Sequence, residues 1–521
     1  MNTPSFRHRP FVRPFFLASA SPCVCVAVAL FSRPALALDP EVTSDSAAQA
    51  YDMRNPTGNT VIERTRFTTT LGLSLYDILG EDKIRRDGPE LDFRARVRYD
   101  ADYGVSAGET DNTNYGAFVP GLADNTGLVD VMYAYLEGRR FAHGIVGFKL
   151  GRQYMVDSLG WWSFDGAEVK ATLPFYVAVE GYGGLEVRGG LPLSTPRFEA
   201  GGVWRGNRNG FDPSLYPQFQ PADIAPAFGA AIDSAGVTWL HSRLTYRRVY
   251  NTGSVGVTEF ANANVPPPVP AYSDMRVSTD RLGYAVEADF RKWGGVKAGL
   301  SYDLYNVKFS QVYAAFDVFA TKHLTLSVDY DYFAPTYDAD SIWNVFASEP
   351  INDVSLRGSW VQGRLSASAG AHARIYTLDT SNPSPGDSSP NLQQPNAGYF
   401  PTNGHPFDEG GDLAGKYKWG SGNVGLRSAA DFGDAGDRVG ADITAQQVFE
   451  SRYLTQARVG VWNWDDKLRP EGSTTNVGYM LGAGYRFAPR CQTMFEFQHD
   501  INRLVGSRLR ALLTLSLAFG R

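Results

Sequence analysis

The stretch from residue 91 to residue 100 reads Leu-Asp-Phe-Arg-Ala-Arg-Val-Arg-Tyr-Asp. Successive side chains of a β-strand point to opposite faces, so this stretch would carry leucine, phenylalanine, valine and tyrosine on one face. The opposite face would carry three arginines, Arg94, Arg96 and Arg98, between two aspartates. An apolar face and an ionic face on one strand predict a sheet that separates two very different surroundings.

The same period of two recurs along the chain. Alternating segments lie at residues 282–291, 296–304, 324–332 and 509–519, and shorter ones lie at 485–487 and 495–497. Many are about 9–11 residues long, which is the length that crosses a bilayer at a tilt, whereas strands average about 5–6 residues in globular proteins. Tyrosine and tryptophan recur near the strand ends, where amphipathic rings sit at membrane interfaces. These features favour a membrane sheet over a soluble sandwich.

The connections between these segments alternate in length. Short turns lie at residues 292–295, 320–323 and 361–363, and long polar loops lie at 251–281, 333–352, 378–411 and 463–476. A strand meander with short turns on one side and long loops on the other is typical of outer-membrane barrels. We therefore predict an all-β fold, a single-chain transmembrane antiparallel β-barrel of about 18 strands (roughly 16–22), with short periplasmic turns and long extracellular loops.

Composition argues against a single compact soluble domain and against a protein that binds nucleic acid. The chain has 521 residues, a net charge of -6 and 43% hydrophobic residues. A single soluble core rarely grows beyond about 250–300 residues. The acidic balance offers no basic surface for nucleic acid, so no nucleic-acid partner is expected.

The first 37 residues have the layout of a secretory signal peptide. Arg7, Arg9 and Arg13 precede an apolar run at residues 15–31, and small residues at 35–37 suit a peptidase. Cleavage there would leave Cys491 as the single cysteine, which cannot form an intramolecular disulfide. We expect a signal peptide at 1–37, a short periplasmic segment at 38–60 and the barrel at 61–521, integral to the outer membrane of a Gram-negative cell.

The bilayer dictates which face of each strand meets water. An arginine facing lipid near the midplane costs about 2–4 kcal/mol, so the ionic faces are expected to line a polar lumen. The residues predicted by strand phase to line the pore are Arg94, Arg96, Arg98, Lys149, Gln153, Glu168, Lys170, Arg243, Arg247, Asp289, Lys297, Asp303, Asp329, Asp331, Arg486 and Glu496.

The predicted lumen charges are unevenly distributed. Arginines concentrate at residues 90–103 and 237–249, and acids concentrate at 282–291 and 322–332. Opposed basic and acidic walls would create a transverse field that suits polar or anionic solutes. The alternative is that the charges pair across neighbouring strands and only keep the lumen wet. Both interpretations are open at this point.

The sequence lacks the patterns of familiar catalytic and metal sites. None of the histidines after residue 37 has a His-Glu-x-x-His spacing, and no Gly-x-Ser-x-Gly elbow is present. Asp329, Asp331, Asp338 and Asp340 lack the twelve-residue spacing of a calcium loop. We therefore expect no enzyme, no metal site and no cofactor.

One segment carries a family resemblance. Leu150-Gly151-Arg152-Gln153, followed by Phe164-Asp165-Gly166, resembles a motif of alginate-export-type outer-membrane barrels over residues 150–172. The resemblance implies a barrel of about 18 strands that conducts an anionic polysaccharide through an arginine-rich lumen. Strand phase adds that Arg152 shares a face with Leu150, which aims it at lipid unless the strand ends or bulges there.

These observations lead to a first interpretation and two alternatives. The first is a channel that exports a polysaccharide, assisted by periplasmic export proteins. The alternatives are a passive porin for small polar or anionic solutes, and a non-conducting barrel that serves as a scaffold. In each case the expected partners include outer-membrane lipid and the barrel-assembly machinery.

Overall fold

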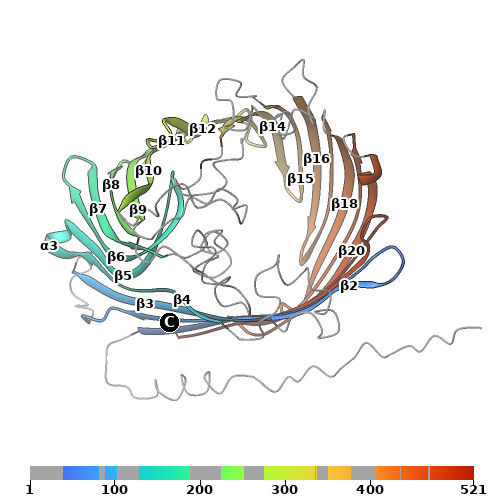
Figure 1. The fold of residues 1–521 in the computed structure, drawn as a ribbon, viewed down its shortest axis with the longest axis horizontal. Helices are drawn as coiled ribbons and strands as arrows, with labels where there is room; N and C mark the ends of the chain where they lie inside the picture. Colours follow the sequence, from blue (N-terminus) through green and yellow to red (C-terminus); the bar gives the residue numbers. More distant parts are fainter. Residues whose placement is uncertain are drawn as a thin grey trace, which may run out of the picture.

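The protein folds as one closed β-barrel (Figure 1). The structure is a computed structural model that describes residues 39–80, 88–102, 128–187, 225–251, 275–334, 336, 350–376, 407–433, 436–467 and 470–520. Within these ranges 22 strands form a single sheet in which neighbours are antiparallel. The first and last strands also pair, from Glu41 opposite Gly520 to Arg54 opposite Ser507, and this pairing closes the sheet.

The strands follow one another around the barrel in chain order. They are β1 (Asp39–Arg54), β2 (Thr60–Tyr76), β3 (Glu90–Asp102), β4 (Leu128–Arg140), β5 (Val146–Asp157), β6 (Gly160–Leu173), β7 (Val177–Glu186), β8 (Pro226–Ser234), β9 (Leu240–Asn251), β10 (Arg276–Asp289), β11 (Gly294–Asp303), β12 (Lys308–Phe319), β13 (Leu324–Phe333), β14 (Ile351–Gln362), β15 (Leu365–Tyr376), β16 (Phe407–Trp419), β17 (Gly422–Gly433), β18 (Gly436–Phe449), β19 (Tyr453–Asp466), β20 (Thr474–Ala488), β21 (Cys491–Asn502) and β22 (Gly506–Gly520). Two short elements, α3 (Phe141–Gly144) and η3 (Pro470–Gly472), lie in connections.

The two ends of the barrel differ in their connections. One end, here called the turn end, carries links such as residues 363–364, 420–421 and 489–490. The other, the loop end, carries the long links, which include residues 103–127, 187–225, 252–275, 334–350 and 377–406. In outer-membrane barrels the short turns are periplasmic and the long loops extracellular. Most of the long links therefore lie at one end of the barrel, as the alternation of link lengths predicted.

The expected strand number of about 18 is wrong, because the barrel has 22 strands. Part of the difference comes from segments without clean alternation. Four of the nine residues of β8 are alanine or glycine, in the sequence Pro-Ala-Phe-Gly-Ala-Ala-Ile-Asp-Ser. Register in the sheet, rather than an amphipathic pattern of its own, defines such a strand.

The expected periplasmic segment at residues 38–60 is also corrected. Residues 39–54 form β1, which pairs with both β2 and β22 and so closes the barrel. The segment contains many serine, alanine and aspartate residues and has no apolar row that would mark it as a strand. The predicted signal peptide at 1–37 lies outside the described residues.

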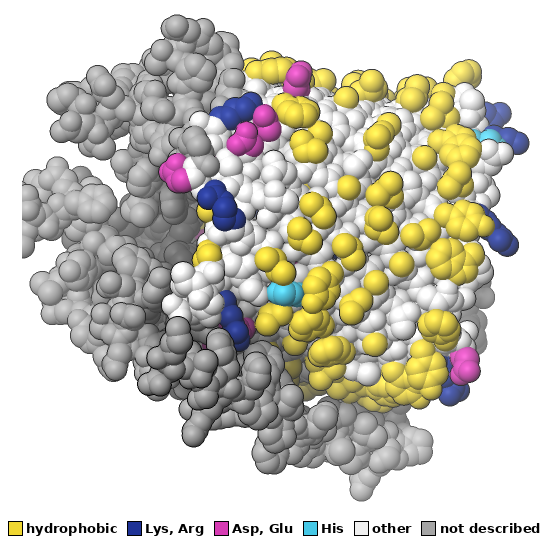
Figure 2. All heavy atoms as spheres, turned by 90° about the vertical axis from the view of Figure 1, so that its right-hand side faces the viewer, with side chains coloured by type: hydrophobic (Ala, Val, Ile, Leu, Met, Phe, Trp, Pro, Cys, Tyr) yellow, Lys and Arg dark blue, Asp and Glu magenta, His cyan; other side chains and the backbone are white. Residues whose placement is uncertain are grey.

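An apolar belt covers the outside of the barrel. Figure 2 shows hydrophobic side chains spread over the outer face, with charged side chains confined mostly to its margins. Leu356, Val459 and Leu481 of this belt are each more than half exposed. In a soluble protein such a surface would be unstable, whereas in a bilayer it replaces contact with water by contact with acyl chains. Among the described residues no helix is long and apolar enough to cross a membrane.

Because the belt faces lipid, an arginine should destabilise the barrel more on the outer face of a strand than on its inner face. Leu481 of β20 lies on the outer face, and its neighbour Met480 pairs with Arg458 on the inner face. Leu481→Arg is expected to lower the free energy of unfolding in lipid vesicles by about 2–4 kcal/mol, because its guanidinium must enter lipid. Met480→Arg, the matched control, places the same group in the lumen and should change it much less. Equal losses in the two variants would contradict the assignment of faces.

Candidate functional site

The inner face of the barrel carries the ionic side chains. Pairing aligns Asp45, Thr70 and Arg98 across β1, β2 and β3, on the face opposite Leu71 and the belt. Close contacts confirm this alignment, because Arg96 donates to Asp45 at 2.6 Å and to Thr70 at 2.8 Å. These contacts cross three strands and so fix which side chains share the inner face.

The register places all of the predicted pore-lining residues on this inner face, but it does not leave all of them open to water. Arg94, Arg96, Lys149, Lys170, Arg243, Asp289, Lys297, Asp329, Asp331, Arg486 and Glu496 are partly or well exposed. Arg98, Gln153, Glu168, Arg247 and Asp303 are buried. These five therefore do not line free lumen, because neighbouring side chains or an inward-folded hairpin cover them.

An arginine-rich wall occupies four adjacent strands, β22, β1, β2 and β3, which run along the lower side of the ring in Figure 1. Its inward arginines, here called the arginine wall, are Arg64, Arg66, Arg94, Arg96, Arg98, Arg508 and Arg510. Acidic partners of these arginines include Asp45 of β1 for Arg96 and Asp500 of the adjacent β21 for Arg508, the latter at 2.7 Å. Arg64, Arg66, Arg508 and Arg510 were not identified from the sequence, although Arg66, Arg508 and Arg510 each lie between two uncharged residues of a strand.

Elsewhere in the lumen most charges pair across strands. Lys149 lies 3.2 Å from Glu168, and Lys297 lies 2.9 Å from Glu287. Arg243 bridges two acids, Glu180 at 2.7 Å and Asp233 at 2.9 Å. The acids of β13 contact neutral groups, because Asp329 accepts from Ser355 and Asp331 from Gln311. Cross-strand pairing thus describes β5 to β11, and in β22 to β3 inward arginines lie close together among acids such as Asp45 and Asp92.

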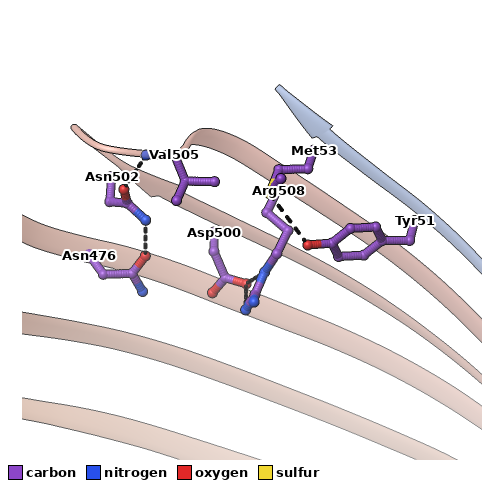
Figure 3. Close-up of a pocket in the computed structure, with 7 residues that line it drawn as sticks. All are labelled: Tyr51, Met53, Asn476, Asp500, Asn502, Val505 and Arg508. Carbon is purple, nitrogen blue, oxygen red and sulfur yellow. Dashed lines mark hydrogen bonds and ion pairs between the residues drawn. The ribbon is translucent and has the colours of Figure 1, made fainter. Parts of the chain in front are cut away.

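A cavity of about 240 Å³ indents the arginine wall toward the loop end. Figure 3 shows Arg508 and Asp500 next to each other among the lining residues, with Tyr51 and Met53 of β1 on one side. Asn502 donates to Asn476 at 3.3 Å on the other side. The cavity combines an ion pair, two amides and a phenol, which are groups that contact a small polar solute through hydrogen bonds.

The tip of the β5–β6 hairpin folds into the lumen. Asp157, at the end of β5, accepts from Arg247 of β9 at 2.9 Å. The guanidinium of Arg247 also lies over the ring of Trp162, with its carbon 4.6 Å from the ring centroid. The turn residues Ser158 and Leu159 lie against Gly283 of β10, where a larger side chain would collide with them. The tip therefore spans from β6 across the inner faces of β7, β8 and β9.

Apolar packing supports the hairpin from below. Trp162 stacks on Phe164 with ring centroids 4.4 Å apart, and both contact Tyr182 of β7. The phenol of Tyr182 donates to the backbone carbonyl of Tyr246 at 3.0 Å. Met155, Ala225, Ala227 and Val249 complete this buried cluster. A compact apolar core inside an otherwise polar lumen holds the hairpin in one position and narrows the lumen on this side.

Within the described residues there is no group of three or more His, Cys, Asp or Glu side chains that would hold a metal ion. The candidate site is accordingly the lumen itself, with the arginine wall and the inward hairpin as its two distinctive parts.

Comparison with known proteins gives similar solved structures only. No family model matches the chain, and no curated protein matches it. It is similar to OccAB4 of Acinetobacter baumannii, with 8% identity, a TM-score of 0.41, and 93% of this chain and 98% of that chain covered. It is similar to a BenF-like porin of Pseudomonas fluorescens Pf-5, with 8% identity, a TM-score of 0.41, and coverage of 93% and 99%. It is also similar to the outer-membrane protein OpdK of Pseudomonas aeruginosa, with 10% identity, a TM-score of 0.39, and 93% of this chain and 99% of that chain covered.

Together, the closed sheet, the apolar belt and the asymmetric ends place the chain in the membrane. The protein is an integral outer-membrane β-barrel.

The resemblance to alginate-export-type barrels is wrong. The similar solved structures are Occ proteins and a BenF-like porin, and no model of an export family matches. The motif residue Arg152 lies on the outer face, where Asp165 accepts from it at 2.7 Å and 2.8 Å. It therefore adds no charge to the lumen. Export of a polysaccharide, which depended on this resemblance, loses its support.

Proposed function

We propose that the barrel is a passive diffusion channel for small polar solutes, with a preference for anions, and that it is not an enzyme. The observation that carries the proposal is the exposure of inward-facing charges. Glu287, Lys297 and Arg458 point into the lumen, and their side chains are each about half exposed to water. Side chains in a filled barrel would be buried, so this exposure supports a hydrated path.

The arginine wall supports the preference for anions. A row of guanidinium groups on one side of a narrow aqueous path raises the local concentration of carboxylates and phosphates. The inward hairpin supports an upper size limit, because it occupies lumen space on the β6–β10 side. A channel with these two features suits small solutes better than a polymer.

Reconstitution tests this function directly. Purified protein in planar bilayers is expected to give stable conductance. In liposome swelling, monosaccharides and small organic acids should enter, and a size series of neutral oligosaccharides should show a sharp upper limit. A small carboxylate should enter faster than a neutral molecule of the same size. The absence of conductance would favour the scaffold alternative, and ready passage of long oligosaccharides would contradict the size limit.

A further inference from the structure

The seam between β4 and β5 is paired along only part of its length. Only residues 134–138 of β4 pair with β5, and they face residues 148–152. On its other edge β4 pairs with β3 as far as Leu128, and β5 pairs with β6 as far as Asp157. Within the described residues, therefore, a wedge separates β4 residues 128–133 from β5 residues 153–157. It widens from the middle of the wall toward the loop end.

The inward hairpin accounts for this wedge. The upper part of β5 leans into the lumen with its partner β6, where Asp157 and Trp162 are held by Arg247. β4 remains with β3, and its register shifts by one residue opposite Arg96 and Val97. The two strands are thus pulled apart by contacts on opposite sides of the wedge, so the gap belongs to the folded state.

A wedge of this kind is costly within a bilayer. Unpaired backbone groups facing lipid cost several kcal/mol each, and irregular backbone at membrane depth is tolerated only where it lines a cavity or an aqueous path. β19 and β20, by contrast, pair continuously from Tyr453 opposite Tyr485 to Trp464 opposite Thr474.

Arg152 sits at the apex of the wedge. Its guanidinium donates to the carbonyl of Val131 at 3.0 Å, which is an oxygen on the unpaired edge of β4. The same guanidinium binds Asp165 and lies 3.9 Å from Asp130. Ionisable groups on a lipid-facing surface are rare and usually mark a functional position. Here the ion pair supplies a polar apex to a gap in the wall.

The sides of the wedge are apolar. Val129 and Val156 are each about 70% exposed, at 70% and 71%, and Val131 and Tyr154 are also exposed. The rings of Tyr133 and Tyr154 approach across the gap, with centroids 5.8 Å apart. A small uncharged molecule with an apolar body and at most one polar group fits such a rim, whereas an ion does not.

We propose that the β4–β5 wedge is a lateral portal through which small apolar or weakly amphipathic molecules pass between the lumen and the outer leaflet. The portal rests on the proposed function in one respect, because the molecule reaches it through an open lumen. It adds a second route, since polar solutes continue along the barrel axis while apolar solutes leave sideways.

The test closes the wedge and leaves the axis open. In a Cys491→Ala background, the pair Val131→Cys and Tyr154→Cys is joined by a short, reductant-cleavable bismaleimide. The matched control is Val459→Cys with Tyr479→Cys, an outward pair across the continuous β19–β20 seam. The probe is phenylnaphthylamine, an uncharged aromatic fluorophore that brightens in lipid. It is added to vesicles whose outer leaflet is lipopolysaccharide, so that direct entry is slow.

Before cross-linking, both double variants are expected to accelerate brightening as the parent protein does. Cross-linking across the wedge should return the rate to that of protein-free vesicles, and cleavage of the linker should restore it. The control pair should show no loss, and ionic conductance should persist in every sample. Persistence of brightening after complete cross-linking would overturn the portal, as would a parent protein that adds nothing to the protein-free rate. If the parent protein showed no ionic conductance at all, that result would contradict the axial channel and not the portal.

Discussion

Arg247→Ala is expected to raise the single-channel conductance of the barrel, because it releases the hairpin that narrows the lumen. Arg247 and Asp157 form an ion pair at 2.9 Å in which both side chains are almost completely buried. Removing one partner of a buried pair leaves an uncompensated charge and costs about 3–5 kcal/mol. The stacking of Arg247 on Trp162 is lost as well. Asp157 then gains by moving into water, and the tip of the hairpin must move with it.

Two comparisons make this result specific to the hairpin. Arg458→Ala removes a lumen arginine whose pair with Asp442, at 3.3 Å, lies on β18 and β19 away from the hairpin. Its conductance should stay close to that of the parent protein. The exchanged pair Asp157→Arg with Arg247→Asp restores opposite charges and should recover part of the original conductance. If Arg247→Ala and Arg458→Ala behave alike, the apolar cluster alone holds the hairpin.

Neutralising the arginine wall is expected to shift the selectivity of the channel toward cations. Arg94→Gln with Arg96→Gln removes two positive charges that face the lumen and are about one-third exposed, at 33% and 30%. Their acidic neighbours Asp45 and Glu137 then act without counter-charges. A charged wall attracts ions of the opposite sign. In a potassium chloride gradient the reversal potential should therefore move toward the equilibrium potential of K⁺.

The control for this shift keeps the charge and changes the shape. Arg94→Lys with Arg96→Lys retains both positive groups, so the reversal potential should remain near that of the parent protein. The entry of small carboxylates in liposome swelling should fall in the glutamine variant and persist in the lysine variant. Equal behaviour of the two variants would mean that the wall does not influence the permeating ion.

Strand phase was predictable because it is local. A residue in a strand faces the same side as residues two positions away, and the bilayer requires apolar groups outside. The rows containing Arg94 and Asp329 could therefore be assigned to one face without any tertiary information. The same reasoning aimed Arg152 at lipid, and the structure places it on the outer face beside Asp165.

The strand number was less predictable because it depends on pairing between distant segments. β1 has no apolar row, and it is a strand because β2 and β22 offer it hydrogen bonds along its whole length. β8 owes its place to β7 and β9 in the same way. Such segments can be assigned as strands only once their pairing partners in the closed sheet are known.

The amino-acid sequence by itself determined that this chain forms a membrane barrel with ionic residues on its inner face, because alternation with a period of two is written into each strand. Only the tertiary structure decided which of those residues meet water. Gln153 and Arg247 obey the phase of their strands and are nevertheless buried, because the β5–β6 hairpin leaves the wall and packs over them. The same departure opens the seam beside β4. Contacts between Asp157 and Arg247, ninety residues apart, have no local signature, so no pattern within a strand could reveal them.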